Sequence, residues 1–257
     1  MNFRTPAPAF AAPFRLNHAD RVLLMGSCFT EHIGQRLQNA KIKALVNPCG
    51  IVYNPVSVAE TLEQLLRGDR QFTRNDLFEN GGLWRSWAYH SRFAHPQPEQ
   101  SLSAMQKASD EARKFIEECT CLILTPGTAV VHLLKATGQV VANNHKMPAA
   151  TFDARRLTVE EVVRRLQEVL RAFFEKWPRI RVVFTVSPVR HLRLGMIENQ
   201  RSKAVLLLAC EALVQALPPS ASCYFPAYEL LMDDLRDYRF YEADMIHPSE
   251  MAIEYVW

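Results

Sequence analysis

Five short apolar segments alternate with segments of helical character along the chain. The apolar segments are 22–25, 41–46, 119–125, 181–186 and 222–225. They have the length and composition of buried strands, and glycine or proline follows several of them. Helical spacing of apolar residues is found at 30–40, 56–66, 99–118, 158–177, 199–217 and 249–257. This alternation predicts a three-layer α/β/α fold of the flavodoxin-like type, with a mainly parallel five-stranded sheet.

Two stretches interrupt the alternation and predict β-hairpin insertions. Residues 72–93 place aromatic-rich arms on either side of the turn signal Glu79-Asn-Gly-Gly82, and a second hairpin is predicted around Lys135-Ala-Thr-Gly138. No internal repeat or low-complexity linker divides the chain. We therefore expect a single domain over residues 1–257, with insertions at about 70–95 and 128–145. Residues 1–20 form an irregular lead-in, and the sequence stops inside an expected helix, which leaves open whether a C-terminal segment is missing.

Composition narrows the classes of partner. The formal net charge of +3 is spread along the chain, and its densest basic stretch, Arg164-Arg165 with Arg171, falls on the polar face of a predicted helix, so no nucleic-acid partner is expected. No run approaches the roughly 18 apolar residues of a membrane span. The six cysteines show no metal-binding spacing, and prolines interrupt the region where a signal peptide would be apolar. A reduced, cytoplasmic protein without a membrane segment is the expectation.

Polar residues follow each of the predicted strands. In parallel α/β sheets, ligands bind beyond the carboxyl ends of the strands. Ser27 follows the first strand, Gly50 the second, Gly127-Thr128 the third, Ser187 and Arg190-His191 the fourth, and Asp244 and His247 the fifth. We therefore expect these residues to share one edge of the sheet.

Ser27, Asp244 and His247 have the chemistry of a serine hydrolase. Ser27 precedes a predicted helix, whose free N–H groups favour developing negative charge, although an ordinary helix-capping serine would stand in the same place. The Asp-x-x-His spacing lets the carboxylate hold one ring nitrogen while the other faces the serine; a surface turn is the alternative. Together at strand ends, they favour a catalytic set, with Ser27 Oγ within or slightly beyond hydrogen-bond reach of His247.

Other reactive residues have simpler interpretations. Cys28 could serve as a nucleophile at the same helix start, but only one of two adjacent side chains can face the histidine, so we expect it to pack. The acidic residues between Asp233 and Asp244 lack the spacing of a calcium loop. No metal or cofactor is expected. The aromatic residues of the first hairpin are expected to pack within it.

Several motifs together resemble the GSCFA family. The chain has Gly26-Ser-Cys-Phe29, followed by Thr30 where the family usually has alanine. Further segments similar to the family are Asn47–Pro55, Gly127–Ala129, Asn143–Lys146, Thr185–His191, Asn199–Lys203 and Asp234–Tyr241. The resemblance covers nearly the whole chain. That family is similar to SGNH/GDSL hydrolases, in which a serine after the first strand is the nucleophile and a DxxH element supplies the base.

The resemblance implies site residues by position. It assigns Ser27 as nucleophile, His247 as base, Asp244 as its partner, and Gly50 as an oxyanion donor. The asparagine that such hydrolases carry after the third strand is absent. Thr128, Asn143 or His145 could replace it, and Asn143 is narrowly favoured for its amide. We also expect His145, Arg190 and His191 to contact the substrate.

The predicted function is a hydrolase acting through an acyl-enzyme on a small ester or acylated, possibly carbohydrate, substrate. Two alternatives stay open. The same serine could transfer the acyl group to a sugar hydroxyl, or the domain could be a non-catalytic carbohydrate-binding or scaffold module. The sequence specifies neither the substrate nor the oligomeric state.

Overall fold

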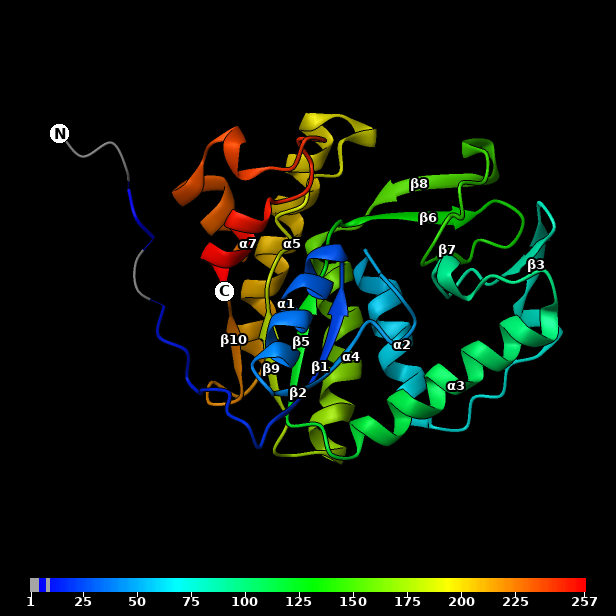
Figure 1. Cartoon of the computed structure of the whole chain (residues 1–257), viewed down its shortest axis with the longest axis horizontal. Helices are drawn as coiled ribbons and strands as arrows, with labels where there is room; N and C mark the ends of the chain where they lie inside the picture. Colours follow the sequence, from blue (N-terminus) through cyan, green and yellow to red (C-terminus); the bar gives the residue numbers. More distant parts are fainter. Residues whose placement is uncertain (1–4, 8–9) are drawn as a thin grey trace.

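A five-stranded parallel sheet forms the centre of the computed structural model, which describes residues 5–7 and 10–257 (Figure 1). Its strands are β1 (Arg21–Gly26), β2 (Lys43–Val46), β5 (Cys121–Thr125), β9 (Arg181–Phe184) and β10 (Ser222–Tyr224). They lie in the order β10-β9-β5-β1-β2, and each neighbouring pair is parallel. This is the flavodoxin-like strand order. The predicted fold class is confirmed, and the sheet is entirely parallel.

Helices cover both faces of this sheet. They are α1 (Cys28–Asn39), α2 (Pro55–Arg67), α3 (Pro98–Ile116), α4 (Val159–Lys176), α5 (Met196–Ala216), α6 (Ala227–Glu229) and α7 (Glu250–Val256). On β1, Leu23 and Met25 pack in the large core with residues of α2, α4 and α5, whereas Val22 and Leu24 pack in a second cluster with Leu37 of α1. This alternation is what a strand covered on both faces requires.

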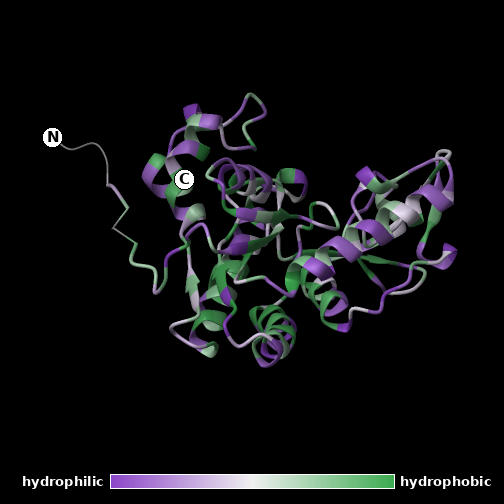
Figure 2. Ribbon diagram, turned by 60° about the horizontal axis from the view of Figure 1, so that its bottom comes forward, coloured by the Kyte–Doolittle hydropathy of each residue, from purple (hydrophilic) through white to green (hydrophobic). Residues whose placement is uncertain are grey.

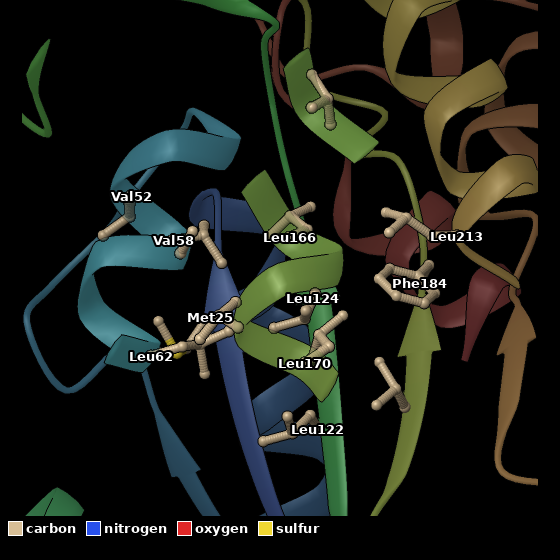
Figure 3. Close-up of a cluster of buried hydrophobic side chains, with 14 of the residues drawn as sticks. Met25, Val52, Val58, Leu62, Leu122, Leu124, Leu166, Leu170, Phe184 and Leu213 are labelled. Carbon is tan, nitrogen blue, oxygen red and sulfur yellow. The ribbon is translucent and has the colours of Figure 1, made fainter. Parts of the chain in front are cut away.

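The larger core is continuous from α2 to α5. Figure 3 shows Met25 of β1, Leu62 of α2 and Leu170 of α4 gathered over the sheet, beside Leu124 and Phe184 of the neighbouring strands. Figure 2 shows the corresponding hydropathy: the central strands are mostly hydrophobic, and the surrounding helices carry both kinds of residue. In the described part of the chain, no helix is long and apolar enough to cross a membrane.

The insertions differ in part from the prediction. The first contains the expected hairpin, β3 (Phe78–Asn80) and β4 (Leu83–Arg85). The second is a three-stranded antiparallel sheet, in which β6 (Val130–Leu134) pairs with β7 (Val140–Val141) and with β8 (Phe152–Arg156). The sequence analysis missed β8 because only Phe152 is buried in it, so no alternating pattern exists. Figure 1 shows this small sheet near the edge to which the parallel strands point.

Two further segments complete the description. A π-helical turn over Leu230–Leu235 continues α6, and neither was predicted. Within the lead-in expected over 1–20, residues 5–7 and 10–20 carry no helix or strand, and residues 1–4 and 8–9 lie outside the described residues.

Helix α1 approaches β2 closely through Gly34. A Cβ atom at this position would lie 2.3 Å from Val46 Cγ2, far inside van der Waals contact. A larger residue would therefore push α1, and with it the start of the helix at Ser27, away from the sheet.

Replacement of Gly34 by alanine tests this contact. We expect Gly34→Ala to destabilise the protein by about 1–2 kcal/mol, because overpacking outweighs the gain in helix propensity. Adding Val46→Ala should remove the clash, so that the double variant is more stable than the sum of the single effects predicts. Urea unfolding of the four proteins measures this coupling, and strictly additive effects would contradict the contact.

Candidate active site

Ser27 lies at the carboxyl end of β1 and at the N-terminus of α1. It is the N-cap residue by backbone conformation, but its side chain makes no capping hydrogen bond. Instead, Ser27 Oγ donates to Ser187 Oγ at 2.7 Å, and both residues are fully buried. The capping alternative therefore does not explain this serine.

The Ser27 N–H is engaged, since it donates to the carbonyl oxygen of Thr125 at 3.1 Å. Of the N–H groups that follow in the first turn of α1, that of Thr30 donates to Ser27 O at 3.0 Å, whereas those of Cys28 and Phe29 have no acceptor in the preceding turn. The start of α1 thus presents donors and a positive dipole end next to the Ser27 hydroxyl.

Asp244 and His247 form the expected pair. Nδ1 of His247 donates to Asp244 Oδ2 at 2.6 Å, and Asp244 Oδ1 accepts the N–H groups of Ile246 and His247. These hydrogen bonds to the charged form hold the pKa of Asp244 low, at about 2. Because Nδ1 carries the proton, Nε2 of His247 presents its lone pair and has the chemistry of a general base.

The loop that carries this pair is attached to the sheet edge. A β-bridge joins Tyr241 to Pro248, and the N–H of Arg190, beyond β9, donates to Ile246 O at 3.3 Å. Ile246 packs in the same apolar cluster as Phe29, two residues after Ser27. His247 is thereby held on the side of the sheet where α1 begins. Among the described residues, no hydrogen bond joins Ser27 to His247, whose separation was expected to lie within or slightly beyond hydrogen-bond reach.

Gly127 marks the space beside Ser27. A Cβ atom at Gly127 would lie 2.8 Å from His191 Nε2, 3.4 Å from Ser27 Cβ and 3.4 Å from Tyr53 Cδ1. Side chains from three strand ends therefore approach Gly127 so closely that a side chain at this position would clash with His191.

His191 stands out within this group. Its Nε2 atom is buried and has no hydrogen-bond partner among the described residues, and its backbone N–H donates to Asn199 Oδ1 at 2.8 Å. The ring packs edge-on against Tyr53. Burial, with the charges of Lys203 and His247, lowers the pKa of His191 to about 3, so this imidazole is neutral.

Lys203 is the buried cation of the site. It is 1% exposed, and its Nζ donates to the carbonyl oxygens of Gly127 and Ser187, each at 2.6 Å. Burial lowers the pKa of Lys203 to about 7. A single side chain of α5 therefore joins the ends of β5 and β9 near Ser27.

Lys203 belongs to a polar face of α5. Ser202 Oγ accepts the N–H of Ala129 and lies 2.9 Å from Thr128 Oγ1, while Asn199 binds His191 as described above. The sequence analysis noted this segment only as a family motif. The signal was present, because three polar residues spaced i, i+3 and i+4 share one face of a largely apolar helix.

Gly50 does not occupy the predicted role in this arrangement. Its N–H donates to Asn47 O at 2.7 Å within a tight turn, so it is not free to bind an oxyanion. Its φ of +83° and the close approach of His90, whose Cβ lies 2.1 Å from the position of a Cβ at Gly50, account for the glycine.

The three predicted replacements for the missing asparagine lie in different settings. The Thr128 hydroxyl is bound to Ser202 and also accepts the N–H of Val130. Asn143 reaches the loop after β2, where its amide makes one long contact of 3.5 Å with Ile51 O. The second insertion thus folds back towards the site, as an Asn143 donor would require.

His145 is a structural residue, which corrects its prediction as a site residue. Nε2 donates to Ser86 O at 2.7 Å, and Nδ1 lies 3.1 Å from Ser91 Oγ. The ring is buried beside Phe78 and Trp87. Both nitrogens are used in holding the two insertions together, so neither faces a substrate.

Arg190 points into a separate cavity. Its guanidinium lies over the rings of Tyr241 and Tyr238, at 4.7 and 5.3 Å from their centroids. These residues line a cavity of about 180 Å³. Arg190 and His191 are adjacent in sequence but therefore have different surroundings.

Cys28 is not activated as a nucleophile. Burial raises the pKa of its thiol, which opposes formation of the reactive thiolate. Its side chain packs in the apolar cluster that contains Phe29 and Val189. This agrees with the packing role expected from the sequence.

Comparison with known proteins gives one family. A sequence model of the GSCFA family matches residues 21–257. No curated protein matches the chain. Among solved structures, it is similar to a Streptococcus pneumonia protein assigned provisionally as a platelet activating factor, with a TM-score of 0.46 and 12% identity, covering 92% of this chain and 80% of that one. It is also similar to a carbohydrate esterase of family 3 from Talaromyces cellulolyticus, with a TM-score of 0.43 and 8% identity, covering 92% of each chain. A third similar structure is that of an acetyl esterase variant with an acetate ion, with a TM-score of 0.42 and 7% identity, covering 92% of each chain.

The buried state of Lys203 predicts a pH dependence of stability. Its pKa is about 7 when folded and about 10.4 in an unfolded chain, so between these values the unfolded state binds more protons. The contribution of Lys203 to stability therefore rises with pH across this window. We expect the unfolding free energy of wild type, relative to that of Lys203→Met, to increase with pH by up to about 1.4 kcal/mol per pH unit.

Urea unfolding between about pH 7 and pH 10 measures this difference. Lys107→Met, at an exposed position of α3, is the control for loss of a lysine, and its difference from wild type should stay constant. A constant difference for Lys203→Met as well would show that Lys203 does not change its proton affinity on folding.

Proposed function

We propose that this chain, which belongs to the GSCFA family, is a serine esterase that acts on a small ester or acylated sugar through an acyl-enzyme on Ser27. The observation that carries the proposal is the pairing of Asp244 with Nδ1 of His247, which leaves Nε2 of His247 as a base, on a loop held beside the start of α1. Ser27 stands at that helix start. Nucleophile, base and orienting carboxylate are the three parts that acyl transfer to serine needs.

The reaction follows from these parts. Nε2 of His247 takes the proton of Ser27 as Oγ forms a bond to the ester carbon, and the carbonyl oxygen becomes negative. When the carbon–oxygen bond to the leaving alcohol breaks, His247 returns the proton to that alcohol. Water then attacks the acyl-enzyme by the same two steps, which releases the acid and restores Ser27.

The surroundings of Ser27 support stabilisation of the intermediate. The N-terminal dipole of α1 and the Lys203 ammonium, held at Gly127 and Ser187, both favour negative charge beside Ser27. Before attack, Ser27 Oγ has to leave Ser187 and turn towards His247, since it donates to Ser187 at rest.

Transfer to an alcohol is the second candidate. Ser27 has no exposed surface, and the ring of Tyr53 lies beside Gly127 at the same place. A site with little water favours a hydroxyl acceptor that brings its own binding contacts over free water. Product analysis with and without a sugar acceptor separates the two reactions.

Reaction of the purified chain with a fluorophosphonate probe tests the nucleophile. We expect intact mass to show one covalent adduct on wild type and none on Ser27→Ala, and p-nitrophenyl acetate turnover to be lost in Ser27→Ala. Ser187→Ala is the matched control. It removes the hydroxyl bound to Ser27 but should keep the adduct and most of the turnover.

Labelling that persists in Ser27→Ala would contradict the assignment of Ser27 as the nucleophile. A wild-type chain that neither reacts with the probe nor hydrolyses the ester would point to a binding or scaffold module instead.

Replacement of Asp244 by asparagine tests the orienting carboxylate. The Asn Oδ1 can still accept the N–H groups of Ile246 and His247, so the loop should keep its shape. The amide NH₂, however, would face Nδ1 and favour the wrong tautomer of His247. We expect kcat to fall by about 100-fold or more with little change in KM. Glu242→Gln, on the same loop, should be close to wild type, and an Asp244→Asn enzyme of normal kcat would remove Asp244 from the mechanism.

A further inference from the structure

Most of the residues predicted as oxyanion donors are already engaged in other hydrogen bonds, and Asn143 makes one long contact of 3.5 Å with Ile51 O. The N–H of Gly50 is bound to Asn47, the hydroxyl of Thr128 to Ser202, and both nitrogens of His145 to the insertions. The Ser27 N–H is bound to Thr125 as well. A tetrahedral intermediate needs donors aimed at its oxygen, and loss of one such donor costs about 100- to 1,000-fold in turnover.

His191 has a buried ring nitrogen near Ser27 that lacks a hydrogen-bond partner among the described residues. Its Nε2 is shielded from solvent and, among residues 5–7 and 10–257, has nothing to bind. A buried nitrogen left without a hydrogen bond costs about 1–3 kcal/mol, so such groups are rare unless a ligand completes them. Gly127 separates Nε2 from Ser27, and both lie within 3.4 Å of where a Cβ at Gly127 would be.

We propose that His191 donates a hydrogen bond from Nε2 to the substrate oxygen that becomes negative when Ser27 attacks. It thereby replaces the asparagine that the loop after β5 lacks. This role rests on the esterase function proposed above. The step forms one N–H···O hydrogen bond and transfers no proton, so His191 is unchanged after the reaction.

The packing around His191 suits a fixed donor. Asn199 Oδ1 binds its backbone N–H, and Tyr53 packs against the ring with centroids 5.2 Å apart. Lys203, four residues after Asn199 on the same face of α5, holds the carbonyls of Gly127 and Ser187. The donor and the two loops beside Ser27 are therefore positioned by one helix, as preorganised oxyanion stabilisation requires.

His191 and His247 differ in their electrostatic environments. Burial opposes protonation of His191, and so do the charge of Lys203 and that of His247 whenever His247 is protonated. A neutral imidazole that carries its proton on Nε2 donates a hydrogen bond without becoming an acid, which suits an electrophilic role. His247 has the opposite environment, with a carboxylate at Nδ1 and a half-exposed ring. His247 is thus the base and His191 the donor.

Three variants in the full chain test the proposal. His191→Ala removes the donor, His191→Gln replaces Nε2–H by an amide N–H at similar reach, and His132→Gln in β6 controls for loss of a half-buried histidine. With p-nitrophenyl acetate, we expect kcat to fall about 100-fold or more in His191→Ala, with KM little changed. His191→Gln should recover to within about 10-fold of wild type, and His132→Gln should match wild type. Thermal unfolding confirms that each variant is folded.

Nitrogen-15 NMR of histidine-labelled protein gives a readout that does not depend on turnover. The His191 signals, identified by their loss in His191→Gln, should be those of a neutral ring protonated at Nε2, and should stay so as the pH falls to about 5. A ring protonated at Nδ1 would overturn the proposal, because Nε2 could then only accept.

The outcomes separate this inference from the function on which it rests. Near-normal kcat in His191→Ala, with turnover lost in Ser27→Ala, overturns the role of His191 and leaves the esterase intact. Loss of the acidic limb of the pH–rate profile in His191→Gln would identify His191 as the base and would also overturn its proposed role as a hydrogen-bond donor. Unchanged ester turnover in Ser27→Ala would instead remove the proposed function, and the donor with it.

Discussion

Lys203 reaches from α5 to the carbonyl oxygens of Gly127 and Ser187, and the positions of the groups around Ser27 depend on this contact. An ammonium group loses much of its hydration on burial, and two carbonyl oxygens at 2.6 Å replace part of it. Breaking the contact would leave two buried acceptors without donors and remove a side-chain link between the ends of β5 and β9, which the hydrogen bond from Ser187 N–H to Pro126 O also joins. The same residue therefore determines local structure and places a positive charge beside Ser27.

Basic groups with different partners give the site its chemistry. Lys203 is surrounded by carbonyls, His191 has no acceptor, and His247 binds the carboxylate of Asp244. The first two are buried, and the charge of Lys203 adds to burial in opposing protonation of His191. Neighbouring groups whose proton affinities are driven apart can perform different roles at one pH.

The five-stranded sheet could be predicted from the sequence, because five apolar runs and their order along the chain leave few arrangements open. The sequence also predicted the position of Ser27 at the end of β1 and the hydrogen bond between Asp244 and His247, which depend on local spacing and strand ends. It did not reveal β8, whose only buried residue is Phe152, or the contacts of His145, which form between two insertions. Nor could it identify Lys203 as a bridge, since that requires knowing that the face of α5 meets the ends of β5 and β9. Contacts between distant segments set those roles, and no local pattern encodes them.

The hydrogen bond between Ser27 and Ser187 fits a resting state. Ser187 Oγ accepts from Ser27 and from the N–H of Val189, so it is oriented by backbone. A neutral hydrogen bond of this kind contributes only about 0.5–1.5 kcal/mol net, which is small beside an enzymatic barrier. Rotation of Ser27 about χ1 exchanges this partner for another without moving the backbone. Ser187 therefore keeps the Ser27 hydroxyl ordered in a buried site, and in the proposed reaction that hydroxyl can turn to His247 at little cost.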